Sequence, residues 1–179
     1  MILSDPATNP LYRLSSISTL SSLLGVKEGH LLFVCYNRAD SRKYESFVIP
    51  KKRGGTRKID SPLSGLKLIQ ERLAGLLSAH ISFKPCVQGF VKGRGICSNA
   101  DFHKRSRWVL NLDIKDFFEN INFGRVRGIF IAKPFEMDPK VASVIAQICI
   151  FQNRLPQGAP TSPVISNSIG CMLDNKIIH

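Results

Sequence analysis

Apolar residues recur every three or four positions in six stretches of the chain. This spacing predicts amphipathic helices, because it places the apolar side chains on one face of each helix. The predicted helices span residues 11–24, 28–36, 62–80, 123–132, 139–148 and 160–175. In the last of them, the residues expected to pack under a sheet are Val164, Ile165, Ile169, Met172 and Leu173.

Local signals mark several helix ends. Gly25 is expected to stop the first helix, because glycine readily adopts the left-handed conformation that follows a helix. Ser61-Pro62 and Asp138-Pro139 each combine a capping side chain with a first-turn proline. Both pairs therefore predict helix starts.

Residues 44–50 and 56–60 predict two strands joined by the turn at 51–55, which ends in Gly54-Gly55. A glycine pair between two such runs is typical of a β-hairpin, because glycine adopts positive φ at little cost. The cations at and beside the tip are Lys51, Lys52, Arg53, Arg57 and Lys58. They either form a solvated basic turn or neutralise a triphosphate.

A third strand is predicted from Val109, where apolar and polar residues alternate before Asp113 and Asp116. A carboxylate at the end of a strand is reachable by solvent and suits Mg²⁺, which takes oxygen ligands. Asp113 is therefore a candidate metal ligand. The alternative is that these acids cap a turn or the helix that follows.

The chain has 25 Lys and Arg residues against 13 Asp and Glu residues, and its formal net charge is +12. Such an excess is typical of proteins that bind nucleic acid, because basic side chains release counterions from phosphates. An anionic membrane surface or a ribosomal partner would also fit. The basic residues are interleaved with glycine and apolar positions, which favours a folded basic groove over a disordered tail.

The chain of 179 residues is long enough to bury a core, and 44% of its residues are hydrophobic. Five cysteines stand at positions 35, 86, 97, 149 and 171 without any Cys-Xaa-Xaa-Cys pair. This pattern indicates free thiols in a reducing cytoplasm. The N-terminus shows no secretory signal, and the longest uncharged run, residues 155–173, contains three prolines and is a poor membrane span.

Two stretches together resemble the palm motifs of reverse transcriptases. One is Val109–Phe118, which contains Asp113, and the other is Leu155–Pro163, with the sequence Leu-Pro-Gln-Gly-Ala-Pro-Thr-Ser-Pro. A third stretch, Asn99-Ala-Asp-Phe-His103, is similar to the Asn-Ala-Xaa-Xaa-His signature of retron reverse transcriptases, and it also lies just upstream of Asp113. The resemblance extends from about residue 11 to the end of the chain.

The resemblance implies an α+β fold: a right-hand polymerase fragment with helices around a small antiparallel sheet and a fingers β-hairpin. It divides the chain into an N-terminal helical segment (1–40), fingers with the basic hairpin (41–108) and a partial palm (109–179). It also implies that RNA is copied into DNA from deoxynucleoside triphosphates, by nucleotidyl transfer at two Mg²⁺ ions.

The resemblance assigns roles to individual residues. Asp113 and the carbonyl of Ile114 would bind the metals, and the main chain at Asp116 and Phe117 would cradle the triphosphate. Phe118 matches the aromatic residue beneath the deoxyribose, where its ring leaves no room for a 2′ hydroxyl. The remaining nucleotide contacts would be Arg57, Lys58 and Gln157.

Residues 85–95 predict a loop with several glycines and with Lys92 and Arg94. By the resemblance, its backbone and cations would contact the template, although the loop by itself reads as an ordinary one. Asn99 and His103 are four positions apart and are expected on one face of a short helix. They either handle RNA or form a structural pair.

In this family two consecutive aspartates complete the metal site, and the sequence contains no such pair before His179. We therefore expect these residues to be the fingers and first half of the palm of a longer enzyme, and the isolated chain to be inactive. The implied partners are a structured non-coding RNA, the DNA product and an effector protein in antiviral defence. The alternatives are a non-catalytic RNA-binding module derived from a reverse transcriptase, and a group II intron-like or other defence-associated reverse transcriptase.

Overall fold

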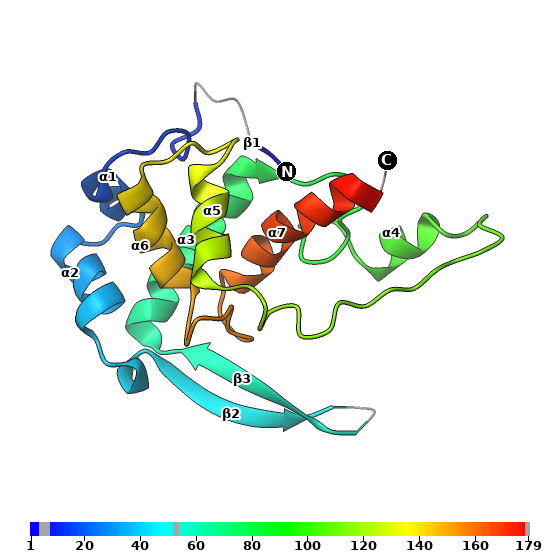
Figure 1. Ribbon diagram of the computed structural model, residues 1–179, viewed down its shortest axis with the longest axis horizontal. Coiled ribbons are helices and arrows are strands. Elements are labelled where there is room, and N and C mark those ends of the chain that lie inside the picture. The colour runs from blue at the N-terminus through cyan, green and yellow to red at the C-terminus, as the bar shows by residue number, and fades with distance from the viewer. Residues whose placement is uncertain (4–7, 52–53, 178–179) are drawn as a thin grey trace.

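The structure is a computed structural model that describes residues 1–3, 8–51 and 54–177. A helical body contains most of the chain, and a two-stranded hairpin projects from it (Figure 1). The combination of helices with small antiparallel sheets confirms the predicted α+β class. None of the described helices is both long enough and apolar enough to cross a membrane.

The helices and strands lie close to most of the predicted ranges. The described α-helices are α1 (Ile17–Leu23), α2 (Glu28–Leu32), α3 (Ser64–His80), α4 (Ile96–Asp101), α5 (Phe123–Ile131), α6 (Pro139–Cys149) and α7 (Ser162–Ile177). A π-helical turn (Phe33–Asn37) continues α2, and a 3₁₀ turn (Asp40–Arg42) follows it. The antiparallel pairs are β1 (Ile2–Leu3) with β4 (Ile81–Ser82), and β2 (Tyr44–Pro50) with β3 (Thr56–Pro62).

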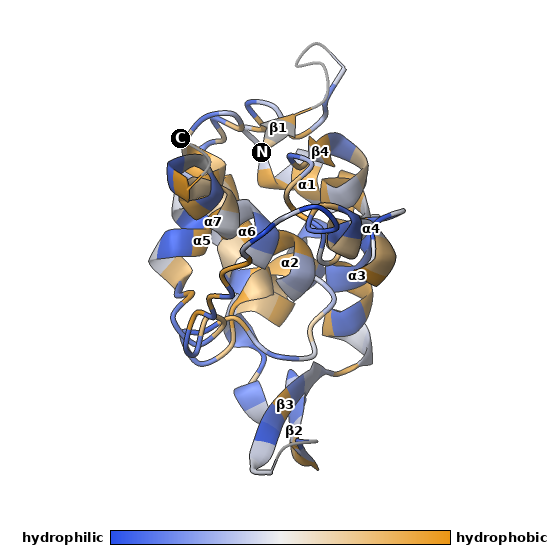
Figure 2. Cartoon of the chain, turned by 90° about the vertical axis from the view of Figure 1, so that its right-hand side faces the viewer, coloured by the Kyte–Doolittle hydropathy of each residue, from blue (hydrophilic) through white to orange (hydrophobic). Residues whose placement is uncertain are grey.

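Helix α6 lies at the centre of the core and packs against α1, α3 and α5. Its start was predicted correctly, because Asp138 Oδ1 accepts from the Lys140 N–H at 2.7 Å and Pro139 occupies the first turn. Ile145 in α6 is fully buried, as are Leu73 in α3 and Val126 in α5. The helices in Figure 2 carry both hydrophobic and hydrophilic segments, as expected when each buries one face.

The first predicted helix is shorter than expected. Residues 11–13 form a turn and 14–16 are irregular, so α1 begins only after Ser16, whose Oγ accepts from the Thr19 N–H at 3.5 Å. Arg13 has a φ of +51°, which breaks helical geometry. The apolar pattern still predicted burial correctly, since Leu11 and Leu14 belong to the core.

The predicted hairpin is confirmed, whereas the helix start predicted at Ser61-Pro62 is wrong. Strand β3 continues to Pro62, which pairs with Tyr44, and α3 follows Leu63. Cross-strand pairing therefore prevails over the local capping signal. Residues 52 and 53 at the hairpin tip lie outside the described residues.

The strand predicted from Val109 is absent: residues 107–114 are irregular and exposed (Figure 1). Trp108, Leu110 and Leu112 are 85%, 81% and 78% exposed. A strand forms only when a neighbour pairs with its backbone N–H and C=O groups. Both sheets of the described residues are formed by other segments, so the alternating pattern has no partner there.

Helix α7 packs against α5 and α3 and not under a sheet. Val164 and Ile165 are buried as predicted, but Met172 and Leu173 are 69% and 43% exposed. Met172 and Leu173 are exposed because the end of the helix extends past the body that covers its first turns (Figure 1). The helix also begins two residues later than predicted, at Ser162.

A buried glutamine attaches the hairpin to the helical body. Gln70 Nε2 in α3 donates to Tyr44 Oη at the start of β2 and to the carbonyl oxygen of Ile148 in α6, each at 2.7 Å. The Tyr44 ring stacks on Phe151 with 4.2 Å between ring centroids. Burial raises the pKa of the Tyr44 hydroxyl, so this group stays protonated and keeps the base of the hairpin in place.

Candidate nucleotide-binding site

The turn Pro156–Gly158, called the glutamine turn below, is bonded to β3. The Asp60 N–H donates to the carbonyl oxygen of Gln157 at 2.8 Å. Gly158 has a φ of +127°, and a Cβ at this position would lie 2.9 Å from Ile59 Cγ2 and 3.0 Å from the Asp60 carbonyl oxygen. The turn therefore approaches the strand so closely that only glycine fits without displacement.

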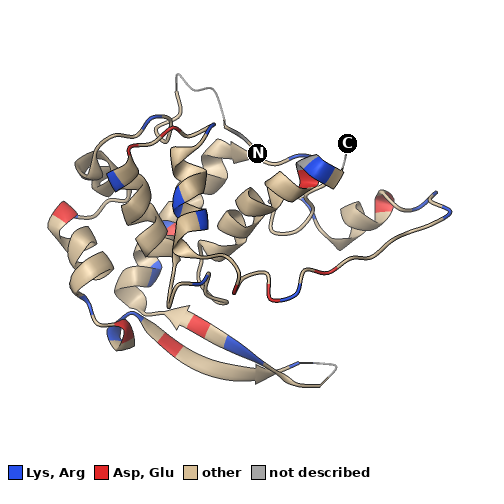
Figure 3. Cartoon of the chain, viewed as in Figure 1, with Lys and Arg blue, Asp and Glu red and all other residues tan. Residues whose placement is uncertain are grey.

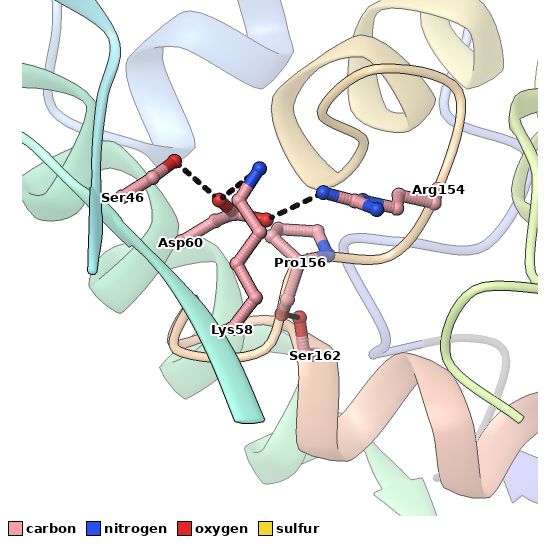
Figure 4. Close-up of polar contacts among 6 residues, drawn as sticks. All are labelled: Ser46, Lys58, Asp60, Arg154, Pro156 and Ser162. Atoms are coloured by element: carbon pink, nitrogen blue, oxygen red, sulfur yellow. Dashed lines mark hydrogen bonds and ion pairs between the residues drawn. The ribbon is translucent and has the colours of Figure 1, made fainter. Parts of the chain in front are cut away.

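The other side of the glutamine turn is held by α7. Ser162 Oγ in the first turn of this helix donates to the carbonyl oxygen of Pro156 at 2.7 Å, and both residues are buried (Figure 4). The turn is therefore held between β3 and α7, and Gln157 is presented from a fixed backbone.

The segment that contains Phe118 reaches the same place. The Leu155 N–H donates to the Phe118 carbonyl oxygen at 3.2 Å. Phe117 and Phe118 are half-buried against the core, and their rings meet edge to face with 6.2 Å between centroids. The backbone of Phe118 is thus bonded to the residue just before the glutamine turn, although Phe118 is not among the residues that line the cleft described next.

A small cleft opens between these segments. Its lining residues come from β3, from the segment after Phe118, from the glutamine turn and from the two residues before that turn. They are Lys58, Asp60, Glu119, Arg154, Leu155 and Gln157. A larger cavity of about 370 Å³ lies elsewhere, between Phe33 and the turn at Asn37–Arg42, and contains none of the predicted site residues. The cleft itself has a volume of about 20 Å³, which is room for about one water molecule, so the candidate nucleotide-binding site is the surface around its mouth.

Asp113 and Ile114 lie outside this cleft. Both are exposed in the irregular segment that leads toward α5, and neither belongs to the residues that line the cleft. Asp116, also exposed, has a φ of +50°, and its carbonyl oxygen accepts from Asn120 Nδ2 at 2.9 Å. The alternative of a turn-forming acid thus describes the backbone at Asp116, while the metal role of Asp113 stays a prediction.

The cations of the hairpin are divided between solvent and the cleft. Arg57 is exposed, and the side chain of Lys58 is 47% exposed with its Nζ 3.5 Å from Asp60 Oδ1. Lys58 therefore lies beside the cleft, whereas the Arg57 guanidinium extends from the strand into solvent. Both remain available to an anionic ligand.

Residues 49–178 match the family model described as reverse transcriptase (RNA-dependent DNA polymerase). The chain belongs to this family. The match includes β3, the cleft and the glutamine turn, so the geometry described above is that of a reverse transcriptase segment.

Curated relatives are retron reverse transcriptases. The chain is 34% identical to the retron Mx65 reverse transcriptase of Myxococcus xanthus, over 88% of this chain and 41% of the relative. It is 32% identical to the retron Ec86 reverse transcriptase of Escherichia coli, over 96% of this chain and 51% of the relative. For the retron Ec73 reverse transcriptase of Escherichia coli the identity is 37%, over 72% of this chain and 44% of the relative. The chain thus spans about half the length of these relatives or less.

In this reverse transcriptase chain, Arg94 shapes its own loop. Its Nη1 donates to the carbonyl oxygens of Lys84 and Val87, each at 2.6 Å, and its Nη2 donates to that of Phe83 at 3.1 Å. Lys92 is exposed at the loop surface. Of the two cations predicted to touch the template, Lys92 is therefore the one whose charge faces solvent.

Asn99 and His103 were predicted to share one face of a helix, and this prediction is wrong. Helix α4 ends at Asp101, so His103 lies in the following turn, where its N–H donates to the Ala100 carbonyl oxygen at 3.0 Å. Both side chains are exposed. After Asp101 the N–H groups of Phe102 and His103 bond to carbonyl oxygens three positions back instead of four. These tighter turns end the helix.

The sequence analysis missed Asp60, Arg154 and Glu119, which line the cleft of this reverse transcriptase segment. Asp60 is 3% exposed although it is charged. The local sequence around Asp60 did not predict a buried ion pair, because its partner Arg154 is 94 positions away in the sequence.

Proposed function

We propose that these residues form the nucleotide-binding part of a retron-type RNA-directed DNA polymerase. The observation that supports this most directly is the convergence of three predicted segments on one cleft. The glutamine turn bonds to Asp60 next to Lys58, and Leu155 bonds to Phe118. Segments from distant parts of a chain that meet at a cleft are typical of a ligand site.

Lys58 and Gln157 in the cleft, and Arg57 and Phe118 near it, suit parts of a deoxynucleoside triphosphate. Arg57 and Lys58 would neutralise the phosphates, and the planar guanidinium of Arg57 would donate two hydrogen bonds to phosphate oxygens. Gln157 would contact the nucleotide from the fixed turn. The Phe118 ring, packed against the core, would exclude a 2′ hydroxyl by its volume.

A divalent metal is part of this proposal. Within the described residues no group of three His, Cys, Asp or Glu side chains could hold a metal ion. The Asp113 carboxylate and the Ile114 carbonyl have the oxygen chemistry that Mg²⁺ prefers, so they fit as part of a site whose further ligands lie outside these residues. When bound, Mg²⁺ would neutralise charge on the triphosphate.

The RNA template would lie along the exposed basic segment that follows α4. Lys104, Arg105 and Arg107 are exposed here together with Phe102 and Trp108. Figure 3 shows Lys and Arg positions in the segment that follows α4. Cations that contact phosphates and rings that stack on bases suit a single strand. We also infer a structured non-coding RNA, an effector protein, a role in antiviral defence and a cytoplasmic location, which the resemblance to retron enzymes supports.

Primer extension tests the proposed activity. The protein is a reverse transcriptase of the length of the curated relatives that contains these residues, called the complete reverse transcriptase below, with an RNA template, a DNA primer and Mg²⁺. Asp113→Ala should reduce the rate by about 100-fold or more, as expected for a lost metal ligand. The control Glu71→Gln, on the exposed face of α3, should keep the rate.

Phe118→Ala tests the sugar contact in the same assay. Incorporation of ribonucleotides should rise relative to deoxyribonucleotides, because the smaller side chain leaves room for the 2′ hydroxyl. Unchanged sugar selectivity would contradict the role of Phe118, and full activity of Asp113→Ala would contradict the metal role.

A non-catalytic RNA-binding module is the second candidate. The exposed cations and aromatic rings after α4 favour it, since they suit RNA whether or not the chain polymerises. This candidate predicts salt-dependent RNA binding without metal-dependent binding of deoxynucleoside triphosphates. Equilibrium titration with each ligand separates the two functions.

A further inference from the structure

The carboxylate of Asp60 is the buried centre of a polar cluster that joins the hairpin to the glutamine turn. Its side chain is 4% exposed. Oδ1 accepts from Ser46 Oγ at 2.5 Å and lies 3.5 Å from Lys58 Nζ, while Oδ2 lies 3.1 Å from Arg154 Nη2 (Figure 4). One acid thus contacts both strands of the hairpin and the segment that leads into the turn.

Arg154 is placed for this contact by its own backbone. It exchanges two backbone hydrogen bonds with Phe151, at 2.9 and 3.1 Å, and the intervening Gln152 and Asn153 have φ values of +50° and +56°. This tight reversal directs the guanidinium toward β3. Its side chain is 26% exposed, so the group also reaches the cleft.

Asp60 holds the glutamine turn through two independent bonds. Its main-chain N–H binds the carbonyl oxygen of Gln157, and its side chain binds Arg154, two residues before the turn. Loss of the side-chain bond alone would leave one main-chain contact between β3 and the turn. The distance between Lys58 and Gln157 would then be less strictly fixed.

Stability alone does not explain a buried ion pair at this place. Removal of two charges from water costs free energy that the pair recovers only in part, and apolar residues often stabilise such a site as well. A charged pair with defined geometry does, however, fix the relative orientation of the elements that supply it.

We propose that Asp60 is a positioning residue for nucleotide binding, which acts through Arg154 and Lys58. This inference rests on the proposed function. Its carboxylate holds the cation of the hairpin and the glutamine turn at a fixed separation before the nucleotide arrives. Preorganisation of this kind lowers the free-energy cost of binding and affects the chemical step little.

Steady-state kinetics of the complete reverse transcriptase test the inference. Asp60→Asn keeps the shape of the side chain and removes its charge. The KM for the deoxynucleoside triphosphate should rise about tenfold while kcat stays within about twofold, because only the binding-competent arrangement becomes rarer. Arg154→Gln should also raise KM, and the double variant should raise it by less than the product of the two single effects, since both changes break the contact between Asp60 and Arg154.

Ile145→Val is the matched control. It removes one methyl group from a fully buried position of α6, at a cost in stability of about 1 kcal/mol, and it changes no polar group of the cluster. Its KM should match that of the parent enzyme. Equal KM values for Asp60→Asn, Ile145→Val and the parent would show that Asp60 is merely structural and would overturn the proposal.

Hydrogen exchange separates this inference from the proposed function. In the complete protein, Asp60→Asn should accelerate exchange of the amides at 57–60 and 155–158 by about tenfold. Unchanged exchange would overturn the cluster's positioning role. A parent protein without polymerase activity would refute the proposed function and, with it, the role of Asp60 in nucleotide binding. Faster exchange in Asp60→Asn would in that case still show that Asp60 joins the hairpin to the glutamine turn. Arg154→Lys serves as the second variant if Asp60→Asn does not fold.

Discussion

A Cβ at Gly158 would lie 3.0 Å from the carbonyl oxygen of Asp60, although the two residues are far apart in the sequence. Gly158→Ala should therefore lower the free energy of unfolding by about 1–3 kcal/mol, because its φ of +127° is strained for alanine and the strand must move. Urea denaturation provides the measurement.

Gly75→Ala is the control for this substitution. Gly75 lies in α3, and a Cβ there would meet nothing within 4 Å. The change should stabilise the protein by about 0.5–1 kcal/mol, since alanine favours a helix interior. Equal effects of the two substitutions would contradict the close approach at Gly158.

Gln70→Leu should destabilise the chain by about 1–3 kcal/mol, because the Ile148 carbonyl and the Tyr44 hydroxyl would lose a buried partner. The double variant with Tyr44→Phe should cost less than the sum of the single changes, since the second change removes one of the unpaired groups. Thermal unfolding of the four proteins measures the coupling. Strict additivity would mean that the Gln70–Tyr44 bond contributes nothing.

The thiols should divide into two classes in the folded protein. Cys86 and Cys97 are exposed, whereas Cys35 and Cys149 are buried and burial raises the pKa of each to about 12. Because the thiolate is the reactive form, a chromogenic disulfide at pH 8 should label the first pair quickly and the second pair only after unfolding. Rapid labelling of Cys149 without denaturant would contradict its burial.

Lys92 and Arg94 should differ in RNA binding. Lys92→Ala should lower the slope of log affinity against log salt by about 1, because one phosphate contact is lost. Arg94→Ala should instead accelerate hydrogen exchange in residues 83–88, since it removes bonds to three carbonyl oxygens. If Arg94→Ala changed only the salt dependence of RNA binding and left hydrogen exchange unchanged, the claim that Arg94 stabilises its loop would be contradicted.

The sequence predicted those features that depend on neighbouring residues. The hairpin follows from Gly54-Gly55 between two apolar runs, and the start of α6 follows from Asp138-Pro139. The contact between Phe118 and Leu155, two residues before Gln157, lies where only the resemblance to a family led us to expect one, because no local pattern relates residues so distant in the chain.

Features that depend on distant partners were not predictable in this way. The alternation after Trp108 is strand-like, yet a strand also needs a neighbouring backbone, and sequence periodicity contains no information about one. The same holds for Asp60 and Arg154, whose pairing follows from the fold and not from their local sequence. Asp113 illustrates the limit, since its residue type predicts a metal while no group of three metal-binding side chains forms among the described residues.

The exposed apolar segment at 108–114 has a consequence for handling the 179-residue chain in solution. This segment has an unpaired backbone and exposed side chains at Trp108, Leu110 and Leu112, so it can pair with the same segment of another copy of the chain. Exposed edge strands aggregate in the same way. Sedimentation should therefore detect concentration-dependent oligomers, and Leu110→Lys should disperse them. Purification of this chain alone is expected to require low concentration or a solubilising fusion.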